Sequence, residues 1–459
     1  GLTSAQRRRN WLSVANGDAE VVVGARSALF LPLVDIGLLI VDEEHDGGFK
    51  QEDGTLYHAR DVAIARARIE QCPVILASAT PSVETAFRAG AIAGSGPAHA
   101  ATQYCSLPAR HGGARMPLID LIDLRRDRLP RGQFISHALQ AAISETLSAG
   151  QQVMLFLNRR GYAPLTICRA CGFRFCCPNC SAWMIEHRFR GRLICHHCGY
   201  VRPLPEYCPE CGAIDSLAGS GPGVERIAEE ASNLFPDAQI AVMASDTVRS
   251  PKAAAQLIDA MQSGKMDILV GTQIIAKGHH FPNLTLVGVV DADVGLTGGD
   301  LRAGERCFQL LYQVAGRAGR EAKSGRVLIQ THMPEHPVMQ ALRSGDRDGF
   351  LQIECEERRA AGMPPFGRLA ALIVAGADGE LVKQTGRRLA SAAPKDDNVY
   401  VLGPAPAPLS LLRGRYRVRL LAKANEEIDL PAWVRQWLRG VRIPSRVHLQ
   451  IDMDPISFL

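Results

Sequence analysis

The sequence lacks any apolar run of about eighteen residues, the length that a membrane-spanning helix requires. Its opening stretch, GLTSAQRRRNW, is polar and has no apolar segment of the kind found in a secretory signal peptide. There is no initiator methionine either, so we expect the chain to begin inside a longer protein. These absences predict a cytoplasmic protein that has no membrane partner.

A strong excess of charge of either sign is also missing. The formal net charge is +5, a mildly basic balance that is compatible with a nucleic-acid partner but does not by itself indicate one. Hydrophobic residues make up 46% and charged residues 22%, as in ordinary globular proteins. A chain of 459 residues is too long for one hydrophobic core and predicts about three domains.

Cysteine is scarce over most of the chain and crowded in one place. Nine of the thirteen cysteines lie between Cys168 and Cys211. A secreted disulfide scaffold would be short and rich in cysteine throughout, so the clustering indicates metal binding instead. The His-x-Glu that precedes Pro-Cys-x-x-Cys in zinc deaminases is absent, which argues against a catalytic zinc ion.

The clustered cysteines form four C-x-x-C pairs, and two such pairs complete one tetrahedral zinc site. The pairs are Cys168 with Cys171, Cys177 with Cys180, Cys195 with Cys198, and Cys208 with Cys211. Eight thiolates suit two zinc ions. A nested arrangement, in which the first pair joins the last, lets the inner hairpin close first; side-by-side pairing and an iron–sulfur cluster are the alternatives. The zinc ions would stabilise a segment too small to bury a core.

Apolar segments that end in polar residues alternate with helical segments along much of the chain. The first set of strands is AEVVVGARSALF, VDIGLLIVDEEHD and CPVILASAT, with HARDVAIARARIEQ as a helix. The second set is QQVMLFLNRRGYAP, KMDILVGTQIIAKG and LTLVGVVDADVGL, with SHALQAAISETLSAG and VERIAEEASNLF as helices. This pattern predicts two parallel sheets covered by helices on both faces and interrupted by the cysteine cluster. A segment of mixed α and β character follows.

The stretch VDEEHD places Asp42, Glu43 and His45 directly after an apolar strand. Taken alone, it could be a helix N-terminus, where acids interact favourably with the helix dipole. However, Ser78 and Thr80 end the next predicted strand, so their hydroxyls would lie beside the acids at the carboxyl edge of the sheet, where such folds bind ligands. No G-x-x-x-x-G-K-[ST] phosphate loop precedes the acids.

A second polar group follows the last helical segment of the second set. QVAGRAGR brings Gln313, Arg317 and Arg320 into one loop with glycine between the arginines. Guanidinium groups stabilise the charge on a transferring phosphoryl group. The loop therefore indicates phosphate recognition, with a solvated surface turn as the other interpretation.

The motifs VDEEHD, SATPSVET, LFLNRRGYAP, VGTQIIAKGHHFP and QVAGRAGR, in this order, resemble the later motifs of the superfamily 2 DNA helicases. With four C-x-x-C pairs inserted into the second lobe, the whole chain resembles the replication-restart helicases of bacteria. The resemblance implies an α/β fold of two RecA-like parallel-sheet helicase lobes, the first incomplete, with a zinc-binding insertion and a C-terminal α+β domain. The expected bounds are 1–131 for the first lobe, 132–165 and 214–338 for the second, 166–213 for the insertion and 339–459 for a C-terminal DNA-binding domain.

The resemblance also implies a role for each motif of the nucleotide site. Asp42 would hold Mg²⁺, Glu43 would orient or deprotonate the attacking water, and His45 would link the site to the second lobe. Ser78 and Thr80 would couple the nucleotide state to closure of the lobes. The residues that would close over ATP are Gln313, Arg317 and Arg320, with the two arginines stabilising the charge of the γ-phosphate.

By the same resemblance, Arg26, Thr272 and Lys277 lie in motifs that contact the DNA backbone or the nucleotide. Phe49 and Tyr57 belong to a loop, DGGFKQEDGTLYHARD, that resembles the family's aromatic-rich loop, which stacks on single-stranded DNA. In this loop, Thr-Leu stands where the family has Trp-Arg, which predicts weaker coupling through it.

Arginines alternate with other residues near the C-terminus. In RGRYRVR these are Arg413, Arg415, Arg417 and Arg419, and on a strand they would share one face. Such a face could contact DNA phosphates; an edge strand that uses charge to prevent aggregation is the alternative.

The resemblance implies an ATP-dependent 3′→5′ DNA helicase that recognises stalled or abandoned replication forks and initiates primosome assembly. The expected ligands are ATP, Mg²⁺ and two Zn²⁺. The expected partners are replication forks, single-stranded DNA, single-stranded DNA-binding protein and primosome loading proteins. The alternative is a zinc-containing DNA-binding protein that assembles a primosome without hydrolysing ATP. Residues 1–459 alone are expected to bind nucleotide poorly and not to unwind DNA, because they contain no phosphate loop.

Overall fold

The computed structural model describes the chain from residue 2 to residue 457 with internal gaps. The residues outside this description are 1, 93–101, 108–115, 128, 131, 159–164, 169–174, 176, 179–183, 188–191, 195–199, 215–216, 221–222, 245–249, 277–280, 294–295, 297–301, 320–324 and 458–459. Within the described ranges, every helix is too short or too polar to cross a membrane.

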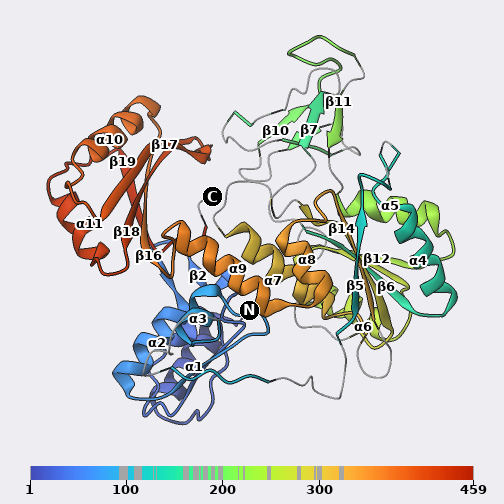
Figure 1. Ribbon diagram of the computed structural model, residues 1–459, viewed down its shortest axis with the longest axis horizontal. Coiled ribbons are helices and arrows are strands. Elements are labelled where there is room, and N and C mark those ends of the chain that lie inside the picture. The colour runs from blue at the N-terminus through green and yellow to red at the C-terminus, as the bar shows by residue number, and fades with distance from the viewer. Residues whose placement is uncertain are drawn as a thin grey trace.

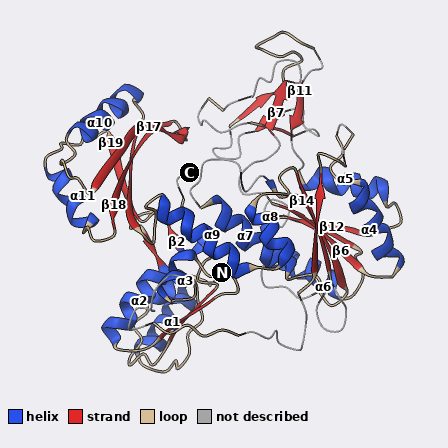
Figure 2. Ribbon diagram, viewed as in Figure 1, coloured by secondary structure: helices blue, strands red, loops and turns tan. Residues whose placement is uncertain are grey.

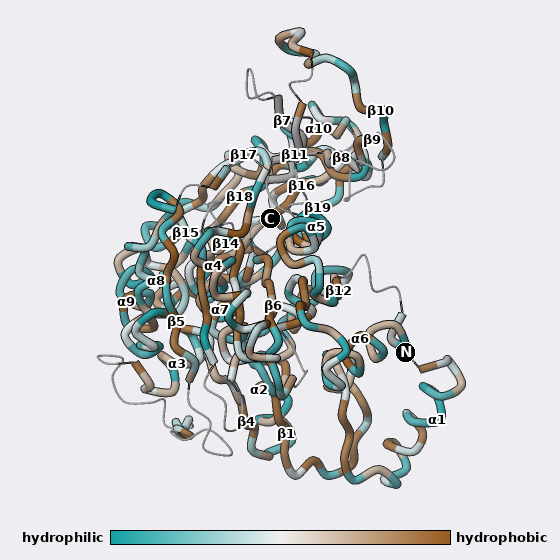
Figure 3. Tube along the Cα trace, turned by 90° about the vertical axis from the view of Figure 1, so that its right-hand side faces the viewer, coloured by the Kyte–Doolittle hydropathy of each residue, from teal (hydrophilic) through white to brown (hydrophobic). Residues whose placement is uncertain are grey.

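Six parallel strands form the sheet of the second lobe (Figures 1 and 2). Their order is β12 (Ile240–Met243), β13 (Ile268–Gly271), β6 (Gln152–Leu157), β14 (Leu284–Asp291), β15 (Arg326–Thr331) and β5 (Leu118–Asp123). Every residue of β6 is buried, as expected for a central strand, and its hydrophobic character is visible in Figure 3. The predicted parallel sheet of this lobe is confirmed.

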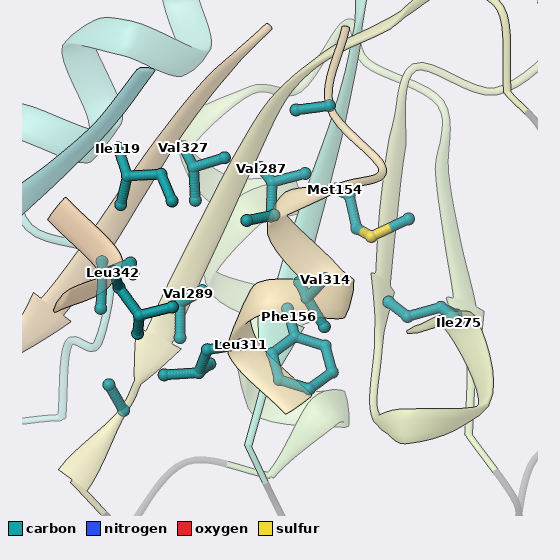
Figure 4. Packing of buried hydrophobic residues seen from close by; sticks show 14 of the residues in the cluster. Ile119, Met154, Phe156, Ile275, Val287, Val289, Leu311, Val314, Val327 and Leu342 are labelled. Carbon is teal, nitrogen blue, oxygen red and sulfur yellow. The ribbon is translucent and has the colours of Figure 1, made fainter. Parts of the chain in front are cut away.

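Helices cover both faces of this sheet. On one face, α6 (Pro251–Gln262), α7 (Ala303–Ala315) and α8 (Pro337–Ser344) pack onto the strands through a cluster that includes Leu311 and Leu342 (Figure 4). On the other face, α4 (His137–Ser148) and α5 (Val224–Leu234) contribute Leu139 and Ile227 to a second cluster. Burial on both sides explains why the strands are apolar runs rather than alternating sequences.

The edge strand β5 changes the expected boundary between the lobes. It pairs with β15 along its whole length, from Leu118 opposite Arg326 to Asp123 opposite Thr331. The second lobe therefore includes residues that precede the expected boundary at 131. At the other end, α8 belongs to the core of the same lobe, which thus extends beyond residue 338. The partner of β5 lies about two hundred residues away in the sequence, so local pattern could not reveal the pairing.

The first lobe contains a two-stranded parallel sheet made of β1 (Leu39–Asp42) and β4 (Val74–Ala77). Three helices accompany it: α1 (Ser4–Ala15), α2 (Ala59–Glu70) and α3 (Val83–Arg88). Ser82 caps α3, because its hydroxyl accepts a hydrogen bond from the Thr85 amide. Because β1 and β4 pair in parallel, their polar ends lie side by side, as the sequence predicted.

Residues 19–30 do not form the strand that their composition predicts. Residues 19–24 are irregular, and Arg26–Phe30 form a short 3₁₀ helix. The side chains of Val21 and Val23 are among the most exposed apolar groups, at 81% and 95%. Within the described part of the chain, this segment has no strand beside it, so its β-branched residues gain nothing from extended pairing.

The insertion is a small antiparallel sheet in the order β10 (Val201–Pro203), β9 (Arg192–Ile194), β8 (Ile185–His187), β7 (Leu165–Cys168) and β11 (Leu217–Ser220). Because β11 pairs with β7, the insertion reaches residue 220 and not 213. Its buried hydrophobic cluster is only Phe175, Cys177, Met184 and Leu193 among the described residues. A core this small does not stabilise a fold without further cross-links.

The C-terminal domain is an antiparallel sheet with helices on one face. The strand order is β17 (Val399–Leu412), β18 (Arg415–Asn425), β16 (Gly367–Gly376) and β19 (Val447–Met453). The covering helices, α10 (Gly379–Ser391) and α11 (Leu430–Arg439), bury Leu389 and Trp437, and the Trp437 indole donates a hydrogen bond to the Leu389 carbonyl at 2.9 Å. The predicted α+β character of this domain is confirmed.

One further helix, α9 (Arg347–Ala360), connects the second lobe to the C-terminal domain and lies between the two lobes (Figure 1). Its Leu351 and Cys355 pack with Val83 and Ala86 of α3 in a separate hydrophobic cluster. The first lobe is therefore attached to a helix that follows the second lobe in sequence.

Candidate active site between the two lobes

The acidic cluster lies where β1 ends. In the parallel pairing, Asp42 is opposite Ala77, which brings the residues after β4 beside the acids. Asp42 is exposed, and its Oδ1 accepts a hydrogen bond from the Glu43 amide at 3.0 Å. Glu43 has a backbone φ of 50°, in the left-handed region that a non-glycine residue rarely adopts. This turn directs the chain out of the sheet at the site where the sequence predicted a metal- and water-binding pair.

The third acid, Glu44, has a different task. Its side chain is buried, and its Oε1 accepts a hydrogen bond from the Ser82 amide at 2.6 Å. Its Oε2 accepts from the Thr85 hydroxyl at 3.0 Å and from Arg60 Nη1 at 3.0 Å. Glu44 therefore holds the first turn of α3, as acids do at helix N-termini.

His45 joins the ends of the two strands. Its Nδ1 lies 2.7 Å from Ser78 Oγ and its Nε2 lies 3.5 Å from Thr80 Oγ1. The imidazole is almost buried, with 6% of the side chain exposed. The predicted proximity of Ser78 and Thr80 to the acidic cluster is thus present in the structure, with His45 between them.

Gln313 reaches this group from the second lobe. It lies near the end of α7, and its Nε2 donates a hydrogen bond to Glu43 Oε2 at 3.1 Å and lies 3.1 Å from His45 Nε2. An amide nitrogen can only donate, so His45 Nε2 accepts and, in the neutral ring, the proton is on Nδ1 facing Ser78. One amide therefore connects the two lobes through Glu43, which is expected to activate water, and His45, which is expected to link the site to the second lobe.

The arginine loop follows directly after α7. The Arg317 amide donates to the Val314 carbonyl at 3.0 Å, and the Gly319 amide donates to the Leu284 carbonyl at 3.0 Å, which folds the loop back onto the start of β14. Arg317 is half-buried, whereas Arg320 lies outside the described residues. The structure thus brings Gln313 to the acids and places Arg317 one turn further along.

The predicted DNA-contacting residues of the first lobe lie around the loop after the acids. The guanidinium of Arg26 donates to the Lys50 carbonyl. Phe49 and Tyr57 are half-buried rather than open: the Tyr57 ring meets Phe30 edge-on, with centroids 5.3 Å apart. Lys50 Nζ in turn contacts Asp452 Oδ1 at 2.5 Å, so the loop is tied to β19 of the C-terminal domain. In the second lobe, Thr272 is half-buried next to β13, and Lys277 lies outside the described residues.

The C-terminal arginines do not all share one strand face as predicted. Arg413 and Gly414 form the two-residue turn between β17 and β18, with φ of 51° and 74°. Positive φ at both turn positions matches the twist of a tight hairpin. Arg415 and Arg417 lie on β18, and burial lowers the pKa of Arg417. The turn therefore removes Arg413 from the row, which the alternation in the sequence could not show.

Part of the cysteine cluster is described. The Gly212 amide donates to the Cys208 carbonyl at 2.8 Å and the Cys208 amide donates to the Ala213 carbonyl at 2.9 Å, which forms a tight knuckle around Cys208 and Cys211. Cys208 is buried, Cys211 is exposed, and Cys177 lies in the small core. The backbone of Cys168 lies in β7, while Cys171, Cys180, Cys195 and Cys198 lie outside the described residues. A C-x-x-C knuckle of thiolates next to a minimal core fits a structural zinc ion.

Sequence reasoning missed two polar residues on α7. Glu305 and Gln309 precede Gln313 at intervals of four, so the three lie on one face of the helix. Both are buried, although the rest of the helix packs apolar residues onto the sheet. The sequence signal for these residues was the spacing of four between polar residues within an otherwise apolar helix.

Beside this site, His58 is a buried histidine that the fold keeps neutral. Burial lowers its pKa from 6.5 to about 4, with the positive charges of Arg60, Lys50 and Arg302 adding to the effect and Asp61 opposing it. Its Nδ1 also accepts a hydrogen bond from the Arg60 amide at 3.3 Å as the cap of α2, which requires an unprotonated nitrogen.

We therefore expect stability to decline as the pH falls from 6.5 to about 4, because the unfolded histidine takes up a proton in this range and the folded one does not. The loss approaches about 3 kcal/mol, at about 1.4 kcal/mol per pKa unit. Urea unfolding at several pH values measures it. A His58→Asn variant, which keeps a capping group, should lose this pH dependence, while the exposed His448→Asn control should retain it. An unchanged slope in His58→Asn would refute the assignment.

Three segments of the chain match models of known protein families. Residues 223–322 match the helicase conserved C-terminal domain, residues 177–203 match the PriA DNA helicase Cys-rich region domain, and residues 359–456 match the primosomal protein N C-terminal domain.

Two relatives match along the whole chain. The replication restart protein PriA of Rickettsia felis is 44% identical over 457 residues, which is 100% of this chain and 69% of that protein. The replication restart protein PriA of Bacillus subtilis is 38% identical over 465 residues, covering 100% of this chain and 57% of that protein. Both the order of the domains and the similarity along the chain agree with the lobes, insertion and C-terminal domain described above. The chain belongs to the PriA family of replication restart helicases.

Proposed function

We propose that the protein is an ATP-dependent 3′→5′ DNA helicase that acts at stalled or abandoned replication forks and initiates primosome assembly in the cytoplasm. The observation that carries the proposal is the contact of Gln313 with Glu43 and His45, which joins a helicase-type acidic cluster in one lobe to the arginine loop of the other. A site divided between two lobes can convert hydrolysis into movement of the lobes.

Each residue of the site has a task suited to its chemistry. Asp42, exposed at the end of β1, would bind Mg²⁺, which neutralises phosphate charge when it is bound. Glu43 would orient the attacking water and accept its proton, held by the Gln313 amide. Arg317 and Arg320 would stabilise charge on the γ-phosphate. Ser78 and Thr80 would report the state of the site through His45.

Residues 1–459 contain no G-x-x-x-x-G-K-[ST] loop to cradle phosphates. We therefore propose that hydrolysis requires such a loop from outside these residues. In the two relatives named above, 31% and 43% of the length lies beyond the matched part, which leaves room for it.

DNA would be contacted by residues from several elements: Arg26, Phe49, Tyr57, Thr272, Lys277, Arg413, Arg415 and Arg417. Arg415 and Arg417 on β18 and Arg413 in the turn lie near the tip of the β17–β18 hairpin, whose Leu412 packs against the insertion. Two zinc ions, each held by four of the eight paired cysteines, would stabilise the insertion. Single-stranded DNA-binding protein and primosome loading proteins would be the protein partners.

The test is unwinding of partial duplexes by the protein produced together with the coding residues that precede Gly1 in its gene. We expect ATP-dependent strand displacement on substrates with a 3′ single-stranded tail and little on substrates with a 5′ tail. Fork binding without ATP hydrolysis would instead support a non-hydrolysing primosome-assembly protein and refute the helicase assignment.

A further inference from the structure

The lobes meet along one face of α7. Glu305, Gln309 and Gln313 lie one turn apart on this face, and each contacts the first lobe. Glu305 Oε1 accepts a hydrogen bond from the Val83 amide at 2.9 Å, and Gln309 Nε2 donates to the Thr80 carbonyl at 3.4 Å. Gln313 completes the row at Glu43 and His45. A shift of α7 against the first lobe would therefore move Gln313 away from the acids.

The first contact of this row is held by an arginine from α9. Arg358 Nη2 lies 2.7 Å from Glu305 Oε2, and Arg358 Nη1 lies 3.4 Å from Glu84 Oε1 on α3. The same guanidinium also pairs with Glu354 on α9 at 2.9 Å. One side chain thus bridges a carboxylate of the first lobe and a carboxylate of the second.

The three side chains that form this bridge are buried. The side chain of Arg358 is 6% exposed, and those of Glu84 and Glu305 are each 5% exposed. Arg302, from the start of α7, pairs with Glu84 as well. A buried carboxylate is costly unless it is paired, so loss of the Arg358 guanidinium is expected to weaken the contact between α3 and α7, which Arg302 would still hold in part.

The charges required for this bridge are present at neutral pH. Burial would raise the pKa of Glu84, but Arg302, Arg358 and Arg60 outweigh it and lower the pKa to about 2. Burial opposes the charge of Arg358, yet Glu305, Glu84 and Glu354 together raise its pKa above the ordinary value. Arg358 and Glu84 are therefore both charged at neutral pH.

The helix that carries Arg358 is itself fixed to the first lobe. Leu351 and Cys355 pack against α3, and Arg347 Nη1 donates to the Ala79 carbonyl at 3.2 Å, between Ser78 and Thr80. Phe366, just beyond α9, meets Phe87 of α3 edge-on, with centroids 4.8 Å apart. Because α9 cannot move away from α3 easily, Arg358 transmits the position of α3 to Glu305 and hence to α7.

We propose that Arg358 is a positioning residue for the nucleotide site: it holds α7 against the first lobe so that Gln313 remains in contact with Glu43 and His45. This inference rests on the proposed function, since the contact matters for catalysis only if the site hydrolyses ATP. Arg358 lies outside all the motifs that the sequence suggested, on a helix that follows the second lobe. The C-terminal domain is thereby linked to lobe closure through the helix that leads into it.

Amide hydrogen exchange of residues 1–459 tests the position of the lobes without relying on activity. In Arg358→Met and Arg358→Lys, we expect exchange in residues 41–46 and 78–88 to become about tenfold faster or more, because the bridge is lost or reduced to one carboxylate. Exchange in β6, in the core of the second lobe, should stay as in the parent protein. The matched control is Arg359→Met, which removes an exposed arginine that lies over the Phe366 ring. Unchanged exchange in residues 78–88, or equally faster exchange in β6, would overturn the proposal.

A kinetic cycle then separates positioning from general destabilisation. In the protein that includes the preceding coding residues, Arg358→Lys and Gln313→Ala should each lower kcat about tenfold or more, and the double variant should lose little more than Gln313→Ala alone. Losses that multiply would show that Arg358 acts independently of Gln313 and would contradict the inference. If the parent protein hydrolyses no ATP, the proposed function fails, while the exchange experiment still decides whether Arg358 holds the lobes.

Discussion

Replacing Glu43 by glutamine should lower ATP hydrolysis about 10²–10⁴-fold, the usual contribution of a general base. The protein for this experiment includes the coding residues that precede Gly1. Glutamine has the shape of glutamate and can still accept the hydrogen bond from Gln313, but it cannot take a proton from water. The left-handed backbone conformation at position 43 has the same free-energy cost for glutamate and for glutamine. Steady-state hydrolysis measures the loss, and fluorescent nucleotide titration should show that binding is retained.

The matched control is Glu52→Gln. Glu52 is an exposed carboxylate in the loop after the acids, and the contact seen there uses its carbonyl and not its side chain. The Glu52→Gln substitution should leave the rate of ATP hydrolysis within about twofold of the parent rate, as surface substitutions usually do. A Glu43→Gln enzyme that hydrolyses ATP at the parent rate would remove Glu43 from the reaction and leave the acidic cluster without a catalytic role.

Replacing Cys208 by serine should remove one of two zinc ions per chain and unfold the part of the insertion around β11. Cys208 lies in the knuckle closed by the Gly212 amide, and structural zinc contributes about 10–16 kcal/mol of apparent binding energy in small domains. The cluster of Phe175, Met184 and Leu193 is too small to compensate for that loss. Metal analysis by mass spectrometry counts the ions, and hydrogen exchange shows which segment opens.

The control here is Cys105→Ser, an exposed cysteine outside the four pairs, which should retain both ions. Comparison with Cys195→Ser tests the nested arrangement. If the first pair joins the last, Cys208→Ser and Cys195→Ser should each lose a different ion, and the double variant should lose both. A Cys208→Ser or Cys195→Ser protein that keeps two zinc ions would contradict the assigned ligands.

The parts of the fold that the sequence predicted are those fixed by short-range patterns. The buried run QVMLFL became a central strand because both faces of its sheet are covered. The apolar segment before VDEEHD became a parallel strand because its pairing partner lies close in the chain. Ser78 and Thr80 met the acidic cluster because parallel strands place their carboxyl ends at one edge. Local pattern was enough wherever the partner followed from that rule.

The missed features depend on distant partners. The strand β5 could be assigned to the second lobe only from its pairing with β15, and the apolar residues 19–24 were not a strand because no neighbouring strand is present in the described residues. Arg413 left the predicted row because a two-residue turn begins there. No sequence pattern marked Arg358 as part of the site. Its role arises from carboxylates on α3 and α7, which approach the arginine only after three segments of the chain have folded together.

The rate of ATP hydrolysis, with and without single-stranded DNA, tests most directly whether the contact around Gln313 is one half of a nucleotide site. The comparison is between residues 1–459 and the same protein preceded by its own upstream coding residues. We predict DNA-stimulated hydrolysis in the longer protein, a loss of at least about tenfold on Gln313→Ala, and no appreciable hydrolysis by residues 1–459. Robust DNA-stimulated hydrolysis by residues 1–459 alone, or a longer protein that hydrolyses no ATP, would contradict this account.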